Sequence, residues 1–171
     1  MKETVSSPAI AGTDWDELYG RHAEELIRFV LKLTGDRERA ADLVHDTFVR
    51  AMRSSNQLRD PLAVRAWLYK IAANLTRNEL RRRNLIGFLP FRDEPGSADA
   101  FDAEAAQIHQ ALRSIPADQA VALVLHYQRG FSRAEVAELT GVSEEGAKSR
   151  LARGRANFIA AYRRLDRGLA R

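Results

Sequence analysis

The side chains best suited to chemistry in this 171-residue chain lie between residues 145 and 153. Arg153 can form a paired hydrogen bond with guanine, while Lys148 and Arg150 can hold phosphate groups. Small neighbours let the backbone approach base edges, and Glu145 can accept a hydrogen bond from a cytosine amino group. These features predict a helix that reads the major groove of DNA, although a solvated basic face would carry the same charges. The candidate DNA-binding residues are Glu145, Lys148, Ser149, Arg150, Ala152 and Arg153.

The elements expected to position these side chains form a helix-turn-helix. Ser132 and Glu135 have the spacing of a capping box, which predicts a helix start. Gly141 can adopt the left-handed conformation that ends this helix, and Ser143 can cap the next one. Two helices joined by a short glycine-containing turn, the second rich in Lys and Arg, are typical of DNA-binding modules. The apolar residues of the second helix are Ala147, Leu151, Phe158, Tyr162 and Leu165.

A second cationic row lies in the first half of the chain. Asp60 followed by Pro61 predicts the start of a helix that runs to about Arg83. Four polar residues along it recur at helical spacing and share one side, as a contact with a nucleic-acid backbone requires. A solubilising face is the alternative interpretation. The polar row is Lys70, Asn74, Arg77 and Arg81, and the buried stripe is Val64, Trp67, Leu68, Ile71 and Leu75.

Two further helices precede this row. Thr13 can cap the first helix, which Gly35 ends, and Asp36 can cap the second. Residues 54–59 have no periodicity and are expected to form a loop. The second helix presents a polar face opposite its apolar residues, made of Asp42, Asp46 and Arg50.

Composition excludes several kinds of function. The chain has no Cys, which excludes disulfides and thiolate chemistry, and its four His show no metal-ligand spacing. Neither a signal peptide nor an apolar stretch of about 20 residues is present, which predicts a cytoplasmic protein without membrane insertion. No cofactor, metal or small-molecule substrate is expected, and no constellation of catalytic residues indicates an enzyme. Basic residues gather in 65–92 and 148–171, on either side of the acidic 93–104, as two polyanion-binding regions would require.

The predicted fold class is all-α, with two small helical domains joined by a flexible linker. Periodicity lapses after about residue 84, where Gly and Pro residues interrupt the chain. The apolar segment 85–91 is expected to pack either on the first domain or on a partner protein. The predicted organisation is a disordered leader at 1–12, a first domain at 13–84, a linker at 85–103 and a second domain at 104–168.

Five motifs, in order, resemble those of a known family. The first half contains DLVHDTF at 42–48 and RAWLYKIAANL at 65–75, and it resembles domain two of the bacterial extracytoplasmic-function (ECF) sigma factors. The second half contains ALRSIP at 111–116, LHYQRGFS at 125–132 and GAKSRL at 146–151, and it resembles domain four of the same factors. The likeness covers nearly all of the chain after about residue 14.

The resemblance implies a transcription-initiation factor with three binding surfaces. In the family, the acidic helix of domain two binds core RNA polymerase, and the next helix with the loop before it reads and melts the promoter −10 element. Domain four reads the double-stranded −35 element, and an anti-sigma factor is a further expected partner. Transferred to this chain, the polymerase-binding residues are Asp42, Asp46 and Arg50, and the −10 residues are Asn56, Arg65, Lys70, Asn74, Arg77, Asn78 and Arg81. The −35 residues are the six candidates between 145 and 153.

Two residues depart from the family pattern, and one alternative function stays open. His45 stands where the family usually has Gln, and Glu145 adds a negative charge at the start of the recognition helix. The alternative is a helix-turn-helix regulator that binds DNA without polymerase. It would need a sensor or dimerisation segment, which the first half does not show, and tight sequence-specific binding by the purified chain would favour it.

Overall fold

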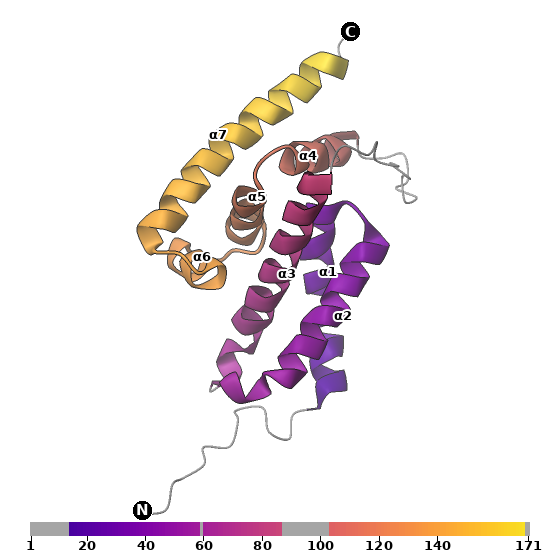
Figure 1. The fold of residues 1–171 in the computed structure, drawn as a ribbon, viewed down its shortest axis with the longest axis vertical. Helices are drawn as coiled ribbons and strands as arrows, with labels where there is room; N and C mark the ends of the chain where they lie inside the picture. The colour runs from indigo at the N-terminus through magenta and orange to yellow at the C-terminus, as the bar shows by residue number, and fades with distance from the viewer. Residues whose placement is uncertain (1–13, 59, 87–102, 170–171) are drawn as a thin grey trace, which may run out of the picture.

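The computed structural model describes residues 14–58, 60–86 and 103–169 (Figure 1). Seven α-helices, two short 3₁₀ turns and one π-helical turn make up the regular structure of these residues, so the predicted all-α fold class is confirmed. None of the helices within the described ranges is long and apolar enough to cross a membrane. The leader at 1–12 and most of the predicted linker lie outside the described residues.

The N-terminal half contains α1 (Trp15–Thr34), α2 (Arg37–Arg53) and α3 (Val64–Ile86). Two 3₁₀ turns, η1 (Ser55–Gln57) and η2 (Pro61–Ala63), lie in the connection between α2 and α3. Gly35, at φ 70°, ends α1, and Asp36 caps α2 by accepting a hydrogen bond from the Arg39 amide, as predicted. The cap of α1 was predicted one residue too early. Asp14 rather than Thr13 is the N-cap, because its carboxylate accepts from the amides of Asp16 and Glu17.

The C-terminal half contains α4 (Ala103–Arg113), α5 (Ala117–Leu123), α6 (Arg133–Thr140) and α7 (Glu144–Leu169). A π-helical turn, η3 (Val124–Gln128), continues directly from α5, and the Arg129 amide closes it on the Val124 carbonyl at 3.1 Å. Gly130, at φ 76°, then turns the chain toward α6. This wider turn was not predicted, since π-helical segments have no distinctive residue pattern.

Helix α3 lies at the centre of the molecule, between α1 and α2 on one side and α5 and α6 on the other (Figure 1). The two halves therefore share one hydrophobic core rather than forming two separate ones. Tyr69 of α3 is fully buried where they meet, with its ring 5.3 Å from that of Phe29 and 5.0 Å from that of Phe131. Each half is small, and small domains bury a limited share of their apolar surface, so packing together increases burial in both.

The predicted inward faces are largely confirmed. On α2, Ala51 is buried whereas Met52 is exposed, so Ala51 is the one of these two residues that packs in the core. On α3, Leu68 is buried and Trp67 packs partly buried against the core, in agreement with its interpretation as a packing residue. Helix α3 continues to Ile86, so the first residues assigned to the linker are helical.

Candidate nucleic-acid interface

The helix-turn-helix is built by the caps that the sequence predicted. Ser132 and Glu135 form a complete capping box, in which the Glu135 amide donates to Ser132 Oγ at 3.2 Å and the Ser132 amide donates to Glu135 Oε2 at 2.7 Å. These hydrogen bonds lower the pKa of Glu135. Gly141 ends α6 at φ 68°, and Ser143 Oγ accepts from the Gly146 amide at 3.1 Å at the start of α7. The turn between α6 and α7 is thereby fixed at both ends.

The buried side of α7 packs against α5. Ala147 and Leu151 are buried, as predicted. Gly154 also faces inward, and a Cβ at that position would lie 3.2 Å from Gln119 Cβ and 3.3 Å from Leu123 Cγ. This close approach fixes which side of α7 faces outward.

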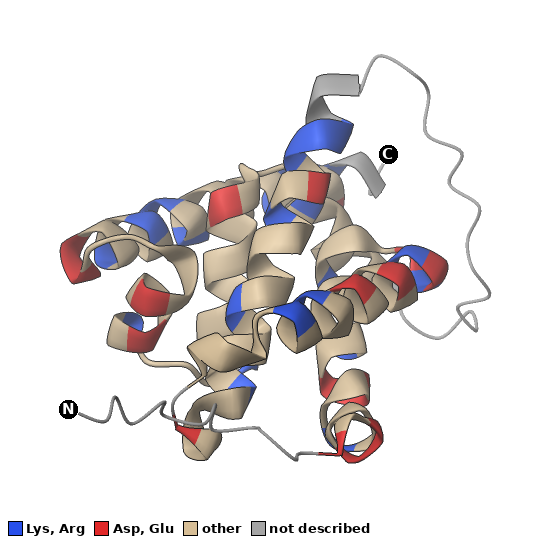
Figure 2. Ribbon diagram, turned by 60° about the horizontal axis from the view of Figure 1, so that its bottom comes forward, with Lys and Arg blue, Asp and Glu red and all other residues tan. Residues whose placement is uncertain are grey.

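Five of the six predicted −35 residues lie on the exposed side of α7. Glu145, Lys148, Ser149, Ala152 and Arg153 are all exposed. Glu145 and Lys148 form an ion pair at 3.4 Å, and Arg153 Nε donates to the Ser149 carbonyl at 3.4 Å. Figure 2 shows basic positions recurring along α7 after the two acidic residues at its start.

Arg150 differs from the other predicted −35 residues. It is only partly exposed, and its Nη1 atom is buried without a hydrogen-bond partner among the described residues. A guanidinium held in this way is less accessible to a phosphate than the side chains of Lys148 and Arg153. The sequence did not distinguish it, since position 150 lies at the edge of the helix face rather than at its centre.

The predicted polar row of α3 does share one side of the helix, but the C-terminal half covers part of it. Arg77 Nη2 donates to Asn74 Oδ1 at 2.7 Å, and Arg77 Nη1 donates to the Thr140 carbonyl of α6 at 3.3 Å. Arg81 Nη2 lies 2.5 Å from Asp118 Oδ2 at the start of α5. Lys70 and Asn78 remain exposed, as does Asn56 in η1.

Arg65, another predicted −10 residue, is also engaged across the two halves. Its guanidinium carbon lies 5.0 Å from the ring centroid of Tyr69 and 4.9 Å from that of Phe131, within cation–π range. Its Nε pairs with Glu25 Oε2 at 3.2 Å. Burial tends to raise the pKa of Glu25, but hydrogen bonds from His22 and Arg65 and the charge of Arg65 outweigh it and lower this pKa.

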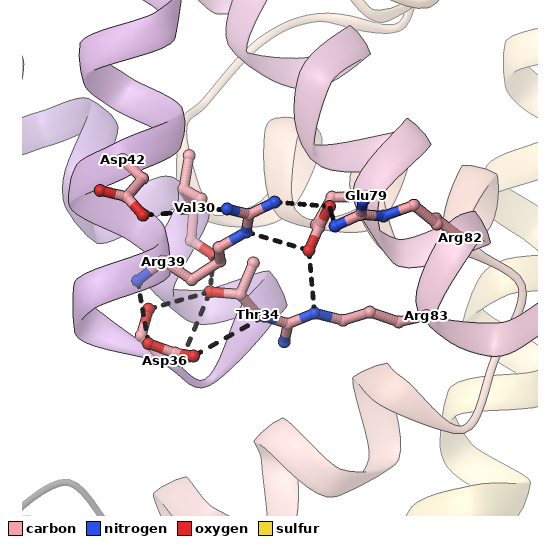
Figure 3. A network of polar contacts seen from close by, with 8 residues as sticks. All are labelled: Val30, Thr34, Asp36, Arg39, Asp42, Glu79, Arg82 and Arg83. Atoms are coloured by element: carbon pink, nitrogen blue, oxygen red, sulfur yellow. Dashed lines mark hydrogen bonds and ion pairs between the residues drawn. The ribbon is translucent and has the colours of Figure 1, made fainter. Parts of the chain in front are cut away.

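The predicted polymerase-binding residues Asp42, Asp46 and Arg50 all lie on the exposed face of α2. A network of charged residues joins this helix to α3 (Figure 3). Arg39 Nη1 lies 3.8 Å from Asp42 Oδ2, and Arg39 also donates two hydrogen bonds, of 3.0 and 2.9 Å, to the carboxylate of Glu79.

Glu79 is the centre of this network and is almost completely buried. Arg82 and Arg83 also pair with its carboxylate, at 3.1 and 3.0 Å, and Arg83 reaches Asp36 at 3.6 Å. Hydrogen bonding to Arg39 is the main reason that the pKa of Glu79 is lowered. The network therefore fixes α2, with its exposed acidic residues, against α3.

The connection before α3 carries one conspicuous apolar side chain. Leu62, the residue after Pro61, is 92% exposed. Asp60 fixes this turn by accepting a hydrogen bond from the Leu62 amide at 2.9 Å, as the predicted cap requires. The turn thus holds the apolar side chain of Leu62 in solvent just before the N-terminus of α3, the helix that carries the polar row.

Comparison with known protein sequences gives matches in both halves. Residues 18–86 match the family model for sigma-70 region 2, and residues 105–158 match that for sigma-70 region 4. The chain is 34% identical over 142 residues to ECF RNA polymerase sigma factor SigL of Mycobacterium tuberculosis, covering 78% of this chain and 80% of that protein. It is 32% identical over 157 residues to SigM of the same species, covering 91% and 80%.

Two solved structures have a similar fold. One is the sigma factor RpoE of Bartonella quintana in complex with the anti-sigma factor NepR, with a TM-score of 0.70, 24% identity, and coverage of 88% of this chain and 97% of that one. The other is CnrH in complex with the cytosolic domain of CnrY, with a TM-score of 0.63, 26% identity and coverage of 85% of each chain.

Proposed function

Since this chain belongs to the ECF family of RNA polymerase sigma factors, we propose that its exposed α2 face binds core polymerase while α3 and α7 read the promoter. The observation that carries this proposal is the exposed face of α7, which follows a complete capping box and a glycine turn. The proposed domains are those predicted, with 13–84 as domain two and 104–168 as domain four. The chain is assigned no catalytic step and no cofactor, and it acts where the polymerase is, in the cytoplasm.

Helix α7 is proposed to read the −35 element in the major groove. Arg153 provides the base-specific contact and Lys148 the phosphate contact, because both side chains are exposed on the same face. Ser149 and Ala152 keep that face shallow enough for close approach. Glu145 already pairs with Lys148, and this reduces the local positive charge at the start of the helix.

Helix α3 and the turn before it are proposed to contact the −10 element. Arg77, Arg81 and Lys70 supply cations for the backbone of the melted strand, and Asn56, Arg65, Asn74 and Asn78 supply hydrogen-bonding groups around it. Opening the duplex costs a few kcal/mol per unstacked base. Contacts with the flipped base at the turn between Asn56 and Leu62 offset part of this cost.

Core polymerase is proposed to bind the α2 face formed by Asp42, Asp46 and Arg50. A single base contact discriminates by only about 1–3 kcal/mol, so neither reading helix alone gives useful promoter selectivity. Polymerase carries both helices, which makes the second promoter contact intramolecular and multiplies the preference. An anti-sigma factor that covers the α2 face would block this step. RpoE, which is similar in fold, forms a complex with the anti-sigma factor NepR.

Run-off transcription with purified core polymerase on genomic DNA fragments tests this division of labour. Arg153→Ala is expected to lower transcription from cognate promoters by about 5- to 150-fold, which corresponds to the loss of about 1–3 kcal/mol, while polymerase pull-down is unchanged. Arg163→Ala, on the same helix but outside the reading face, is the matched control. Equal loss of transcription and of polymerase binding would contradict the assignment.

Asp46→Arg tests the polymerase surface in the same assays. The variant is expected to lose polymerase pull-down and transcription together while its circular dichroism spectrum stays that of a folded helical protein. Glu24→Arg, an equal charge reversal on the exposed side of α1, is the control. An unchanged pull-down would remove the α2 assignment, and tight binding of one duplex by the chain alone at physiological salt would favour the stand-alone regulator.

A further inference from the structure

A cavity of about 590 Å³ lies beside the C-terminal half of α7, beyond the turns of the helix that carry the −35 residues. One wall is the turn between α4 and α5, with Ile115 and Pro116, and the other is α7, with Ala160. Helices α4 and α5 both pack on α7 (Figure 1). We name this hollow the α7 cavity. Three arginines of α7 also line it, namely Arg163, Arg164 and Arg167.

Contacts around the α7 cavity hold its walls in place. Ile115 is buried, so the turn is anchored in the core. Ser114 Oγ donates to the Gln110 carbonyl of α4 at 2.6 Å, and Asn157 Nδ2 of α7 donates to Gln119 Oε1 of α5 at 2.8 Å. A ligand that enters a cavity with fixed walls pays little to order them, which is typical of small-molecule sites.

The three arginines give the α7 cavity a positive charge that no lining residue neutralises. They are exposed, and none of them forms an ion pair within the described part of the chain. Asp118, two residues after the turn, pairs with Arg77 and Arg81 of α3 instead. Asp166 of α7 is exposed and does not line the cavity. Positive charge gathered in a hollow in this way attracts anions.

The arrangement of the arginines suits a ligand with more than one phosphate group. Arg163 and Arg164 lie four and three residues before Arg167, so the three side chains are neighbours on the helix surface. Each guanidinium can pair with a phosphate through two parallel hydrogen bonds.

The opposite wall and the size of the α7 cavity indicate what else the ligand carries. Ile115, Pro116 and Ala160 form an apolar surface, which suits an uncharged, planar group. The volume lies within the range of about 300–1,000 Å³ that is usual for small-molecule sites. A single phosphate ion would fill only a small part of it.

We propose that the α7 cavity binds a nucleoside polyphosphate, with the phosphates on the three arginines and the nucleoside against Ile115, Pro116 and Ala160. This site goes beyond the proposed function, because it requires neither polymerase nor promoter DNA. A duplex is a poorer fit than a small molecule, since a DNA backbone needs an extended row of cations. Here the cations lie within about one turn of α7, and the α4–α5 turn closes one side.

The α7 cavity is separate from the −35 face. Arg163 is ten residues beyond Arg153, which is about 15 Å along the helix at about 1.5 Å per residue. This exceeds the screening length of about 8–10 Å at physiological salt, so charge in the cavity has little effect on the −35 face. A nucleotide and a −35 duplex can therefore be bound together, and Arg163→Ala remains a suitable control for transcription.

Calorimetric titration of the full chain with ATP tests the proposal, with inorganic pyrophosphate and adenosine as the two halves of the ligand. ATP is expected to bind one per chain and at least about tenfold more tightly than either half, because only ATP uses both walls. GTP is titrated in parallel, and saturable binding of either nucleotide supports the proposal. Absence of saturable binding by both would overturn it, as would pyrophosphate that binds as tightly as the nucleotides.

A carboxylate placed in the α7 cavity locates the binding. Ala160→Asp introduces a negative charge among the three arginines and is expected to weaken ATP binding at least about tenfold. Ala134→Asp, the same substitution at an exposed position of α6, is the matched control and is expected to change it less than about twofold. Because both positions are exposed, circular dichroism should show folded helical protein in each case. Equal weakening by the two variants would place the nucleotide elsewhere.

Removing single cations tests the role of the arginines. Arg164→Ala and Arg167→Ala are each expected to weaken ATP binding about tenfold, as the loss of a charged hydrogen bond does. Arg155→Ala removes the same charge from an exposed position of α7 that does not line the cavity. An equal effect of Arg155→Ala would mean that net charge alone attracts ATP, and this would contradict a defined site.

A random-sequence duplex at low salt, which binds through its phosphates, tests whether DNA occupies the cavity instead. The ATP titration is repeated with the chain saturated by this duplex, and the affinity is expected to change less than about twofold. Competition between duplex and ATP would assign the three arginines to the DNA backbone and overturn the proposal. None of these titrations contains polymerase or a promoter, so their outcome does not depend on the proposed function.

Discussion

Helices α3 and α7 have the same design in sequence and different surroundings in the structure. Each has an apolar stripe, a cationic face and a cap or proline at its start. The cationic face of α7 is exposed, whereas that of α3 is contacted by Asp118 and Thr140 of the other half. A basic helix face therefore indicates what a helix can bind, but its own residues do not indicate whether the face is accessible.

The two helices also differ in how they are anchored. Helix α3 is tied to α2 through the buried carboxylate of Glu79, which pairs with Arg39 of α2 and also with Arg82 and Arg83 of α3 itself. Helix α7 is packed against α5 through close contacts at Gly154 and through buried apolar side chains. We expect mutation and acid to change stability differently at the two anchors. The anchor of α3 depends on charge, whereas that of α7 depends on close packing.

The largest effect is expected from removing the charged anchor. Glu79→Ala leaves Arg39 without its two hydrogen bonds and places three guanidinium groups close together, so the free energy of unfolding is expected to fall by about 3–5 kcal/mol. Urea unfolding followed by circular dichroism measures this. Glu138→Ala, an exposed glutamate of α6, is the control and is expected to change stability by less than about 0.5 kcal/mol. A loss of under about 1 kcal/mol in Glu79→Ala would mean that α3 is held mainly by its apolar contacts.

A smaller effect of the same origin is expected in acid. Hydrogen bonding to Arg39 holds the pKa of Glu79 below its ordinary value of 4.5 in the folded protein. The group therefore contributes stability that is fully present above about pH 4.5 and is lost as the pH falls through the lower folded pKa. Glu79→Gln is expected to have a flatter stability profile between pH 6 and pH 3 than the unmodified chain. Parallel profiles would contradict this assignment of the acid sensitivity.

Much of the structure of these helices was predictable from the sequence. Capping residues and apolar periodicity located the helices, the glycine turn before α7 and the outward faces of α2 and α7, because these signals act within a few residues of chain. The Gly141 turn and the Ser132–Glu135 capping box were correct in detail. All of the predicted −35 residues except Arg150, which is partly buried, lie on the exposed side of α7, and their contact with DNA stays a prediction.

The contact between the halves was not predictable from periodicity, because that analysis assumes one buried face per helix. Helix α3 is covered on two sides, so Tyr69 is fully buried although it lies outside the predicted stripe. Asp118 was unremarkable in the sequence, since its partner Arg81 is 37 residues away. Glu79 was missed for a related reason. A buried glutamate is rare, and only its partners in space, above all Arg39 of α2, explain it.

The smallest effect is expected from a substitution at Gly154, where α7 packs closely against α5. It is measured best by comparing two glycine-to-alanine variants whose stabilities are expected to change in opposite directions. Gly154→Ala places a Cβ 3.2 Å from Gln119 Cβ and 3.3 Å from Leu123 Cγ, so α5 and α7 have to move apart slightly. Overpacking costs about 1–3 kcal/mol, and the higher helix propensity of Ala offsets up to about 1 kcal/mol, which leaves a net loss of about 1 kcal/mol.

Gly20→Ala on α1 is the matched control for this substitution. No atom lies within 4 Å of a Cβ at position 20, so only the propensity term remains and the variant is expected to gain about 0.5–1 kcal/mol. Urea midpoints of the two variants should therefore move in opposite directions from that of the unmodified chain. If both rise, α7 is not held by close packing at Gly154, and the two reading helices differ only in the charged anchor of α3.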